Sequence, residues 1–570
     1  VALAAVPAGA QTPQQPLPSQ LPPTPTINLP TPTTAPPATT RVDTRGALPE
    51  TSCPFGDSPI RLKLAAVRFT RSDGGALAAG VARSLSRVAT PGGDQAIKVV
   101  CQLRDDANAA LRRDGWLASV QIPAQSIDSG ELRLQVVTAR ITDIRVHGTP
   151  GPYRKGLEAR IRELRGLDPL NQRDAERALL LAGDIPGLNV QLSLRPAGTA
   201  PGDVIGDLSI TYRPFAVLGN AQNFNSRQLG RETGYLRGEL YGLTGLNDVA
   251  YLGASSTADA REQIIVQGGY TVGLGLSGLT LGPRVIYAWS RPDLGLLDLK
   301  TDTLIAGFDA TLPLKRSLNT NLRAGVGVDY VNQTTRVSTT ASNSVPLNAD
   351  KLRIVFARLS GETGRRRLDG SILYSISGNV EARKGLGIFG ATPVGGVSSA
   401  GAIPSRPDGD SRATVLRADL DVTIGLDRIF SLTASARGQY ASDPLLNYEE
   451  FSLGNLTVGR GYDPGSNSGD RAIGLRIEPA ARLPLRRSNL DAQLFGFYDA
   501  VALTNLDRGQ LEVDRHLRSY GGGARLTLFN RLLFEAIYAH PLDRALTIDK
   551  APPPDRVLVS LTAKFNAPAR

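Results

Sequence analysis

The stretch that most limits how this chain can fold runs from Pro214 to the C-terminus, roughly 355 residues of short alternating segments. Segments such as YLRGELYGL, PRVIYAWS and NLRAGVGVDYV alternate apolar and polar residues and are separated by Gly, Asn and Asp. A period of two is typical of strands, because successive side chains point to opposite faces. No apolar run in the sequence approaches the roughly 20 residues that a membrane-spanning helix needs. The region therefore predicts β-structure.

The length of this region sets the number of strands. About sixteen strands would take about 22 residues each with their connections, which suits an outer-membrane barrel. The mean hydropathy of -0.12 fits such a barrel, because lipid-facing and lumen-facing residues alternate. A soluble all-β array such as a propeller is the alternative, but no repeat of about 40–50 residues is present. We predict a transmembrane β-barrel of about 16 antiparallel strands over residues 214–570.

Residues 59–139 predict a small α+β unit with the element order β-α-α-β-β. A strand begins at Ile60, and apolar residues recur at helical spacing over Ala76–Val88. A second helix over Arg104–Gly115 ends at a glycine, the usual residue past a helix C-terminus. The segments WLASVQI and ELRLQVV follow as two strands.

The same order recurs over residues 140–213. RITDIRVH is a predicted strand, helices are predicted over Tyr153–Leu164 and Gln172–Ala182, and LNVQLSL and DLSITY close the unit as strands. Asn171 stands where its side chain can cap the second of these helices. The repeat lies in the order of the elements rather than in residue identity, and it predicts two tandem units.

The composition of the first 58 residues predicts that this segment forms no folded core. Residues 1–10 end on Ala8-Gly9-Ala10, small residues typical of a signal-peptide cleavage site, although an Ala-rich low-complexity start is the alternative. Residues 11–58 are rich in Pro, Thr and Gln, which predicts a disordered linker. Cys53 and Cys101 are the only cysteines. An exported chain with one such pair favours a disulfide, whereas two buried free thiols are the alternative.

Composition and motifs argue against several function classes. The net charge is +11, but basic residues are scattered among acidic ones and aromatics make up only 5%, so no nucleic-acid surface is predicted. The three histidines lie far apart without metal-ligand spacing. Nucleotide loops, nucleophile elbows and Cys-x-x-Cys pairs are not found. We therefore predict no enzyme, no metal and no cofactor.

A turn-rich stretch over Phe451–Glu478 predicts a long hairpin loop. Arg460 stands between Gly459 and Gly461 and close to Tyr462, which suggests backbone that approaches another part of the molecule while the side chain reaches out. An ordinary polar surface loop is the alternative.

Val458-Gly459-Arg460-Gly461-Tyr462 resembles the Val-Arg-Gly-Tyr or Val-Arg-Gly-Phe tetrad in the sixth loop of two-partner secretion transporters, with one glycine before the Arg-Gly-Tyr core. These are the haemolysin-activator and filamentous-haemagglutinin transporters of the outer-membrane assembly-factor superfamily. The phrases IPAQSIDSGELRLQVVTARITDIRVHG and DPLNQRDAERALLLAGDIPGLNV resemble the family's domain junction and second-domain signature. The resemblance covers about residues 59–565 and implies that the two units are POTRA domains, POTRA 1 (59–139) and POTRA 2 (140–213).

The resemblance also implies a site inside the barrel. Phe497-Tyr498-Asp499 resembles the Phe-x-Asp of the strand whose carboxylate meets the loop arginine. A charged loop tip in a lumen needs a partner, and an arginine–carboxylate contact fixes orientation. We expect a lumen lock made of Arg460, Gly461, Tyr462 and Asp499, with an Arg460–Asp499 pair. Asp463 and Asp470 are alternative partners of Arg460. The alternative for Asp499 is an aspartate that faces solvent at the end of a strand.

Two further expectations concern the barrel's end and its partners. The terminal strand VLVSLTAKF faces lipid on one side and closes on Phe565, which resembles a barrel-assembly signal. The family implies export of one large unfolded exoprotein of haemolysin, adhesin or contact-dependent toxin type, bound by the POTRA domains. It also implies biogenesis through the barrel-assembly machinery and periplasmic chaperones.

The implied location is the outer membrane of a Gram-negative bacterium, as a monomer in contact with lipid and with periplasmic POTRA domains. An outer-membrane protein insertase is the alternative, although insertases usually carry three or more POTRA units. A passive porin is the second alternative.

Overall fold

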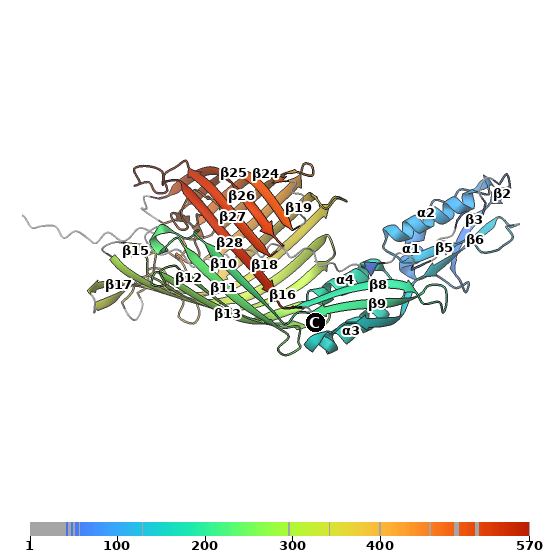
Figure 1. Cartoon of the computed structure of the whole chain (residues 1–570), viewed down its shortest axis with the longest axis horizontal. Coiled ribbons are helices and arrows are strands. Elements are labelled where there is room, and N and C mark those ends of the chain that lie inside the picture. Colours follow the sequence, from blue (N-terminus) through green and yellow to red (C-terminus); the bar gives the residue numbers. More distant parts are fainter. Residues whose placement is uncertain are drawn as a thin grey trace, which may run out of the picture.

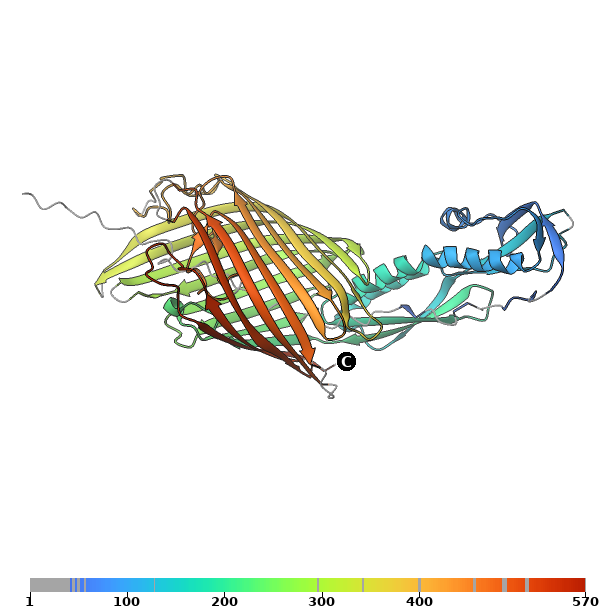
Figure 2. The same ribbon diagram turned by 90° about the horizontal axis from the view of Figure 1, so that it is seen from above.

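The computed structural model describes residues 42–43, 47–48, 52–55, 58–127, 129–294, 297–340, 343–397, 401–454, 458–483, 489–507, 512–529 and 531–568. Two small α+β units lie end to end and lead into a large barrel (Figure 1). A second view, from above, shows the two units and the barrel following one another along one long axis (Figure 2). The predicted signal-peptide remnant over residues 1–10 and most of the predicted linker lie outside the described residues.

The first unit contains the expected elements with one additional strand pair. Its elements are β2 (Arg61–Leu64), β3 (Ala66–Arg71), α1 (Ala79–Leu85), β4 (Gly93–Ala96), α2 (Val99–Arg113), β5 (Ala118–Gln121) and β6 (Glu131–Thr138). Strands β3, β6 and β5 form one sheet, and β2 pairs with β4 separately. The single strand predicted at Ile60 is therefore two strands. The predicted helix over Arg104–Gly115 begins earlier, at Val99, because Val99, Val100 and Leu103 are also buried in the core.

The second unit follows the predicted order. Its elements are β7 (Arg140–His147), the 3-10 turn η2 (Gly151–Tyr153), α3 (Arg154–Arg165), α4 (Gln172–Gly183), β8 (Leu188–Pro196) and β9 (Asp203–Tyr212). The prediction that Asn171 caps α4 is confirmed, because its side chain accepts a hydrogen bond from the Arg173 amide at 2.9 Å.

Part of the predicted linker belongs to this second unit. Strand β1 (Val42–Asp43) pairs in parallel with Leu192 and Ser193 of β8, so the sheet order is β1-β8-β9-β7. Ala47 is also buried in the core of the unit. The prediction of a linker extending to residue 58 was therefore wrong for this segment: a short apolar stretch in a proline-rich region can still add to an open sheet edge.

Sixteen long strands close the barrel in the described part of the chain, with the short strand β15 at one rim. The wall consists of β10 (Phe215–Gln222), β11 (Thr233–Tyr241), β12 (Val249–Thr257), β13 (Gln263–Leu274), β14 (Leu279–Ser290), β15 (Asp293–Leu294), β16 (Leu297–Arg316), β17 (Thr320–Thr340), β18 (Asn343–Arg366), β19 (Ile372–Gly385), β20 (Thr414–Gly425), β21 (Phe430–Ala441), β24 (Arg471–Leu483), β25 (Leu490–Thr504), β26 (Asp514–Leu528), β27 (Leu532–Pro541) and β28 (Arg556–Asn566). Neighbouring strands are antiparallel, and β28 pairs with β10 to complete the ring. The predicted barrel and its strand number are confirmed.

The outer face of the barrel is apolar, as the alternation predicts. Leu236, Leu252 and Val557 are 60%, 67% and 63% exposed, which suits contact with lipid. Among the described residues, we find no helix with the length and apolar character needed to cross a membrane.

The second unit is fastened to three consecutive turns of the barrel. The Tyr153 hydroxyl lies 3.3 Å from the Asp248 carbonyl, between β11 and β12. The Arg160 guanidinium donates to the Leu276 carbonyl, between β13 and β14, at 2.7 Å. At the end of β16, a bidentate ion pair joins Arg316 to Asp184 at 2.7 and 2.8 Å. We call this rim of the barrel the unit side and the opposite rim the far side.

Candidate functional site: a loop held inside the barrel

The site is built on the connection between β21 and β24, residues 442–470, which leaves the far side and contacts inward-facing wall residues. It contains the short pair β22 (Phe451–Ser452) and β23 (Ser468–Gly469). The predicted loop over 451–478 is shifted: Arg471 to Glu478 belong to β24, which pairs with β21 and β25. The turn-rich part of the sequence ends at Asp470. The alternation of apolar and polar residues that follows forms the wall strand β24.

The register of β25 points Asp499 into the lumen. Phe495, Phe497 and Asp499 are buried, whereas Leu494, which precedes Phe495, and Tyr498, which precedes Asp499, are 50% and 43% exposed on the outer face. Asp499 itself has no exposed surface. It therefore does not face solvent at a strand end.

Asp499 receives the loop tip through the backbone. Its Oδ2 accepts hydrogen bonds from the amides of Gly459 at 3.0 Å and Arg460 at 2.8 Å. Arg476 of β24 also pairs with both carboxylate oxygens, at 2.7 and 3.2 Å. The carboxylate thus holds two loop amides and one wall guanidinium at once.

The Arg460 guanidinium has a different partner from the one predicted. Its Nη2 donates to Glu478 of β24 at 2.6 Å, and its Cζ lies 4.4 Å from the centre of the Phe497 ring. Arg525 of β26 also binds Glu478, at 2.5 Å. The structure therefore brings Arg460 and Asp499 together, but by main-chain contact. The predicted side-chain pair is corrected to Arg460–Glu478, because Arg476 already occupies the Asp499 carboxylate.

Gly461 and Tyr462 complete the tip. The Gly461 amide donates to the Ser519 hydroxyl at 3.2 Å, and a Cβ on Gly461 would lie 2.7 Å from Ser519 Cβ and 3.0 Å from the Pro541 nitrogen. Only glycine permits this approach to β26 and β27. Tyr462 is fully buried, and its hydroxyl lies 2.8 Å from the Arg518 carbonyl.

Sequence reasoning missed the contacts at the base of the loop. Arg406, from the loop between β19 and β20, is 2% exposed and touches three carboxylates. Its guanidinium lies 2.6 Å from oxygens of Glu450, Asp470 and Asp507. We call these four residues the base cluster. It ties three far-side loops together.

Burial shifts the titration of the base cluster, which holds three carboxylates and one arginine. Burial raises the pKa of Glu450 to about 7; Arg406 opposes the rise and Asp470 adds to it. Burial likewise raises the pKa of Asp507 above its usual range, against the effect of Arg406. These carboxyl groups lie in loops beyond the membrane-spanning strands.

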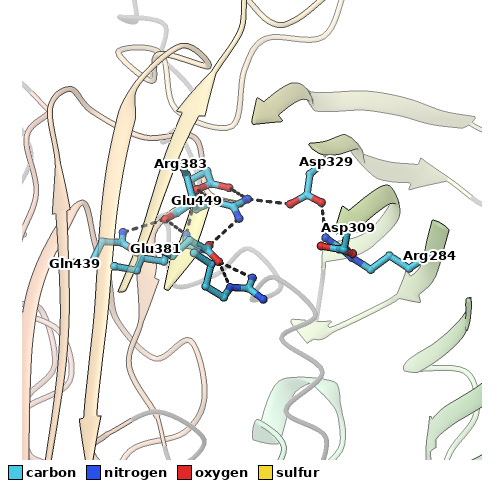
Figure 3. A network of polar contacts seen from close by, with 9 residues as sticks. Arg284, Asp309, Asp329, Glu381, Arg383, Gln439 and Glu449 are labelled. Atoms are coloured by element: carbon cyan, nitrogen blue, oxygen red, sulfur yellow. Dashed lines mark hydrogen bonds and ion pairs between the residues drawn. The ribbon is translucent and has the colours of Figure 1, made fainter. Parts of the chain in front are cut away.

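A second network holds the neighbouring Glu449 (Figure 3). Arg383 of β19 binds Glu449 at 2.9 and 3.0 Å, and it also binds Asp329 of β17 at 3.2 Å. Asp329 in turn binds Arg284 of β14 at 2.5 Å. A chain of ion pairs therefore runs along the lumen wall from β14 to the loop base. The sequence offered only the adjacent Glu449-Glu450 as a signal, without any indication of their distant partners.

The remaining predicted residues lie away from the loop. Cys53 and Cys101 form a disulfide with an S–S distance of 1.95 Å, which joins the segment before β2 to α2. Phe565 of β28 is 56% exposed and opposite Val217 across the closure of the barrel. In the described residues, no group of three or more His, Cys, Asp or Glu could hold a metal ion.

A sixteen-stranded barrel with two N-terminal α+β units and a loop fastened in its lumen defines a class, the outer-membrane barrel transporters with POTRA domains. The model of the family "Haemolysin secretion/activation protein ShlB/FhaC/HecB" matches residues 210–526, which is more than half of the chain. The chain belongs to this family, and it is an outer-membrane transporter of two-partner secretion.

Solved structures share the fold. CdiB from Escherichia coli is 16% identical, with a TM-score of 0.70, covering 91% of this chain and 94% of that chain. CdiB from Acinetobacter baumannii is 15% identical, with a TM-score of 0.63, covering 93% and 95%. BamA from Haemophilus ducreyi lacking POTRA domains 1–3 is 13% identical, with a TM-score of 0.51, covering 88% and 100%. No curated protein matches the chain in sequence. The unit side is periplasmic, and the far side is therefore extracellular.

Proposed function

We propose that this transporter exports one large unfolded exoprotein, of haemolysin, adhesin or contact-dependent toxin type, from the periplasm to the cell surface. The observation that carries the proposal is the loop from β21 to β24, which is fastened inside the barrel at its tip and at its base. A transporter for an unfolded chain needs a lumen that is closed at rest and can be cleared. A loop held by separable polar contacts meets both needs.

We assign recognition of the exoprotein to the POTRA domains, by strand addition. An extended segment gains main-chain hydrogen bonds when it joins an open sheet edge, and side-chain pockets give specificity. Strand β1 supports this assignment, because it adds in parallel to the β8 edge over only two residue pairs.

We assign gating to the lumen lock of Arg460, Gly461, Tyr462 and Asp499. The tip contacts are buried yet polar, so each one lost must be replaced by water or by the passing chain. Arrival of the exoprotein in the lumen supplies both. The lock then reforms once the chain has left.

Biogenesis requires other partners in this proposal. Periplasmic chaperones deliver the unfolded barrel, and the barrel-assembly machinery reads the terminal strand that ends near Phe565. The outward position of Phe565 on β28 supports such reading, because an aromatic side chain on the lipid face is accessible. The barrel then functions as a monomer in the lipid of the outer membrane.

The experiment is deletion of the gene, followed by mass spectrometry of secreted proteins and of the outer-membrane fraction. We expect one large exoprotein to disappear from the surface and medium and to return with the wild-type gene but not with Asp499→Ala. A general loss of outer-membrane barrels would instead support an insertase. Unchanged secretion with reduced uptake of small solutes would support a porin.

A further inference from the structure

The barrel closes where its first strand, β10, meets its last, β28, and this seam continues past the end of β10 at the extracellular end. The Asn223 amide donates to the Val559 carbonyl at 3.1 Å. The Asn223 side chain binds Val557 and Val559 as well, at 2.9 and 2.7 Å. Three hydrogen bonds between Asn223 and β28 therefore hold the extracellular end of the seam.

Asp463, three residues beyond Arg460, contacts both sides of this seam. Its Oδ2 accepts from the Arg227 amide at 3.3 Å and lies 3.5 Å from Arg231, both in the connection that follows β10. Its Oδ1 lies 3.0 Å from the Nη2 of Arg556, the first residue of β28. One carboxylate on the loop therefore touches the elements that flank the seam.

Arg556 adds a second connection between the seam and the loop tip. It is 2% exposed, and its Nη1 donates to the carbonyls of Tyr462 and, at 3.4 Å, of Arg460. A guanidinium this deeply buried is costly to separate from its acceptors. If the tip leaves while β28 stays, the guanidinium loses the carboxylate and both carbonyls together.

The surroundings give the carboxylate room to move. A cavity of about 330 Å³ lies beside it, lined by Arg227, Arg231, Gly461, Asp463 and Arg556 among others. Lys550 and Asp549 also line this cavity. Cations therefore surround Asp463 on the side of the seam.

We propose that Asp463 is a positioning residue that fastens the loop tip to the extracellular end of the β10–β28 seam, so that the tip and the seam loosen together. The Arg460–Glu478 and Asp499 contacts fix the tip to β24 and β25. Asp463 fixes it to both sides of the closure, at β28 and at the connection after β10. The inference does not depend on which protein is exported.

The test is hydrogen exchange of the full-length protein in lipid nanodiscs, comparing wild type with Asp463→Asn. The seam amides of Asn223 and Val559 should exchange faster in the variant by roughly tenfold or more, since a charge-assisted contact is lost on each side. The amides of β13 and β14, which pair within the wall, serve as an internal reference and should not change.

Two further variants complete the test. Asp463→Glu keeps the charge and should stay close to wild type. Asp259→Asn is the matched control, because Asp259 lies in an extracellular turn, where its carboxylate accepts from the Arg261 amide. Should Asp463→Asn fail to assemble a heat-modifiable barrel, Arg231→Gln is measured instead and should also speed exchange at the seam.

Three results would overturn the proposal. The first is a loop that becomes sensitive to protease while exchange at the seam stays at the wild-type rate, since Asp463 then acts only within its own loop. The second is an equal increase at the seam in Asp259→Asn. The third is wild-type exchange at the seam in Arg231→Gln.

Discussion

The two ends of the lumenal loop are held by opposite electrostatic arrangements. Around Arg460 and Asp499 at the tip, three cations face three anions: Arg460, Arg476 and Arg525 against Glu478, Asp499 and Glu535. Within the four residues of the base cluster, one cation, Arg406, faces Glu450, Asp470 and Asp507. A balanced group resists a change of pH, whereas an acid-rich group depends on one cation and on protonation. We therefore expect pH to change the contacts at the base more than those at the tip.

The largest effect should come from removing the single cation of the base. Arg406→Ala leaves three buried carboxylates beside one another, at a local cost of about 3–5 kcal/mol, reduced to the extent that they take up protons. The loop connections at 386–413 and 442–450 should then become accessible to protease added outside the cell.

The control for this prediction is Arg412→Ala, which removes an exposed arginine paired with Asp410 in the same region. It should change the cleavage rate little, because exposed pairs contribute about 0–1 kcal/mol. Equal cleavage in the two variants would mean that the base cluster does not hold the loops.

The next effect concerns the tip, where Asp499→Ala should weaken the loop more than Arg460→Ala. Asp499 holds two loop amides and Arg476, whereas Arg460→Ala keeps the amide contacts. We expect about 3–5 kcal/mol for the first change and about 1–3 kcal/mol for the second. The effects of the two substitutions are compared by the protease sensitivity of the tip and by the amount of exoprotein exported.

A double-mutant cycle refines this comparison. Arg460 and Glu478 should show strong coupling because their side chains are paired, and Arg460 and Asp499 weaker coupling because the Arg460 side chain is not the group that Asp499 binds. The reverse order of coupling energies would restore the side-chain pair that the sequence suggested.

The smallest effect is a pH dependence confined to the base. The folded-state pKa of Glu450, about 7, lies above its ordinary value near 4.5, so the closed base binds this proton more tightly than the open one. Its stability should be greatest below pH 4.5, fall by about 1–3 kcal/mol as the pH rises toward 7, and level off above. Hydrogen exchange at the Leu445 and Leu506 amides, which donate to Asp470, reports this after correction for intrinsic rates.

Two comparisons check the origin of this pH dependence. Glu450→Gln should remove most of it, and the Arg460 amide at the tip should show none over the same range. Slower corrected exchange at the Leu445 and Leu506 amides as the pH rises would contradict the role of Glu450.

The sequence allowed much of the fold to be predicted because barrel walls and amphipathic helices repeat locally. Alternation identified the strands, and Asn171 identified the start of α4. Arg460 and Asp499 were chosen because they stand in short motifs that resemble those of the family, and they do lie together, through the Arg460 main chain. Such inferences need only neighbours along the chain or a short motif.

The missed features depend on contacts that no local pattern encodes. Arg406 lies in a polar loop, 44 residues from Glu450 and 64 from Asp470, and nothing in its surroundings in the sequence marks it. The choice of Glu478 by Arg460 depends on the register of β24, which decides which residues face the lumen. The two residues of β1 are too few to show any periodicity.

The attachment of POTRA 2 to the barrel has a mechanical consequence. Its side-chain contacts reach the turns after β11, β13 and β16 through Asp248, Leu276 and Arg316. The chain itself enters β10 after a two-residue connection from β9. A pulling force applied to this domain by a captured chain is thus shared among strands on one flank of the cylinder. Without those three attachments, more of the load would fall on β10, the strand that borders the seam. POTRA 2 is therefore attached to the barrel at several points. These attachments reduce the force on β10 and on its hydrogen bonds to β28.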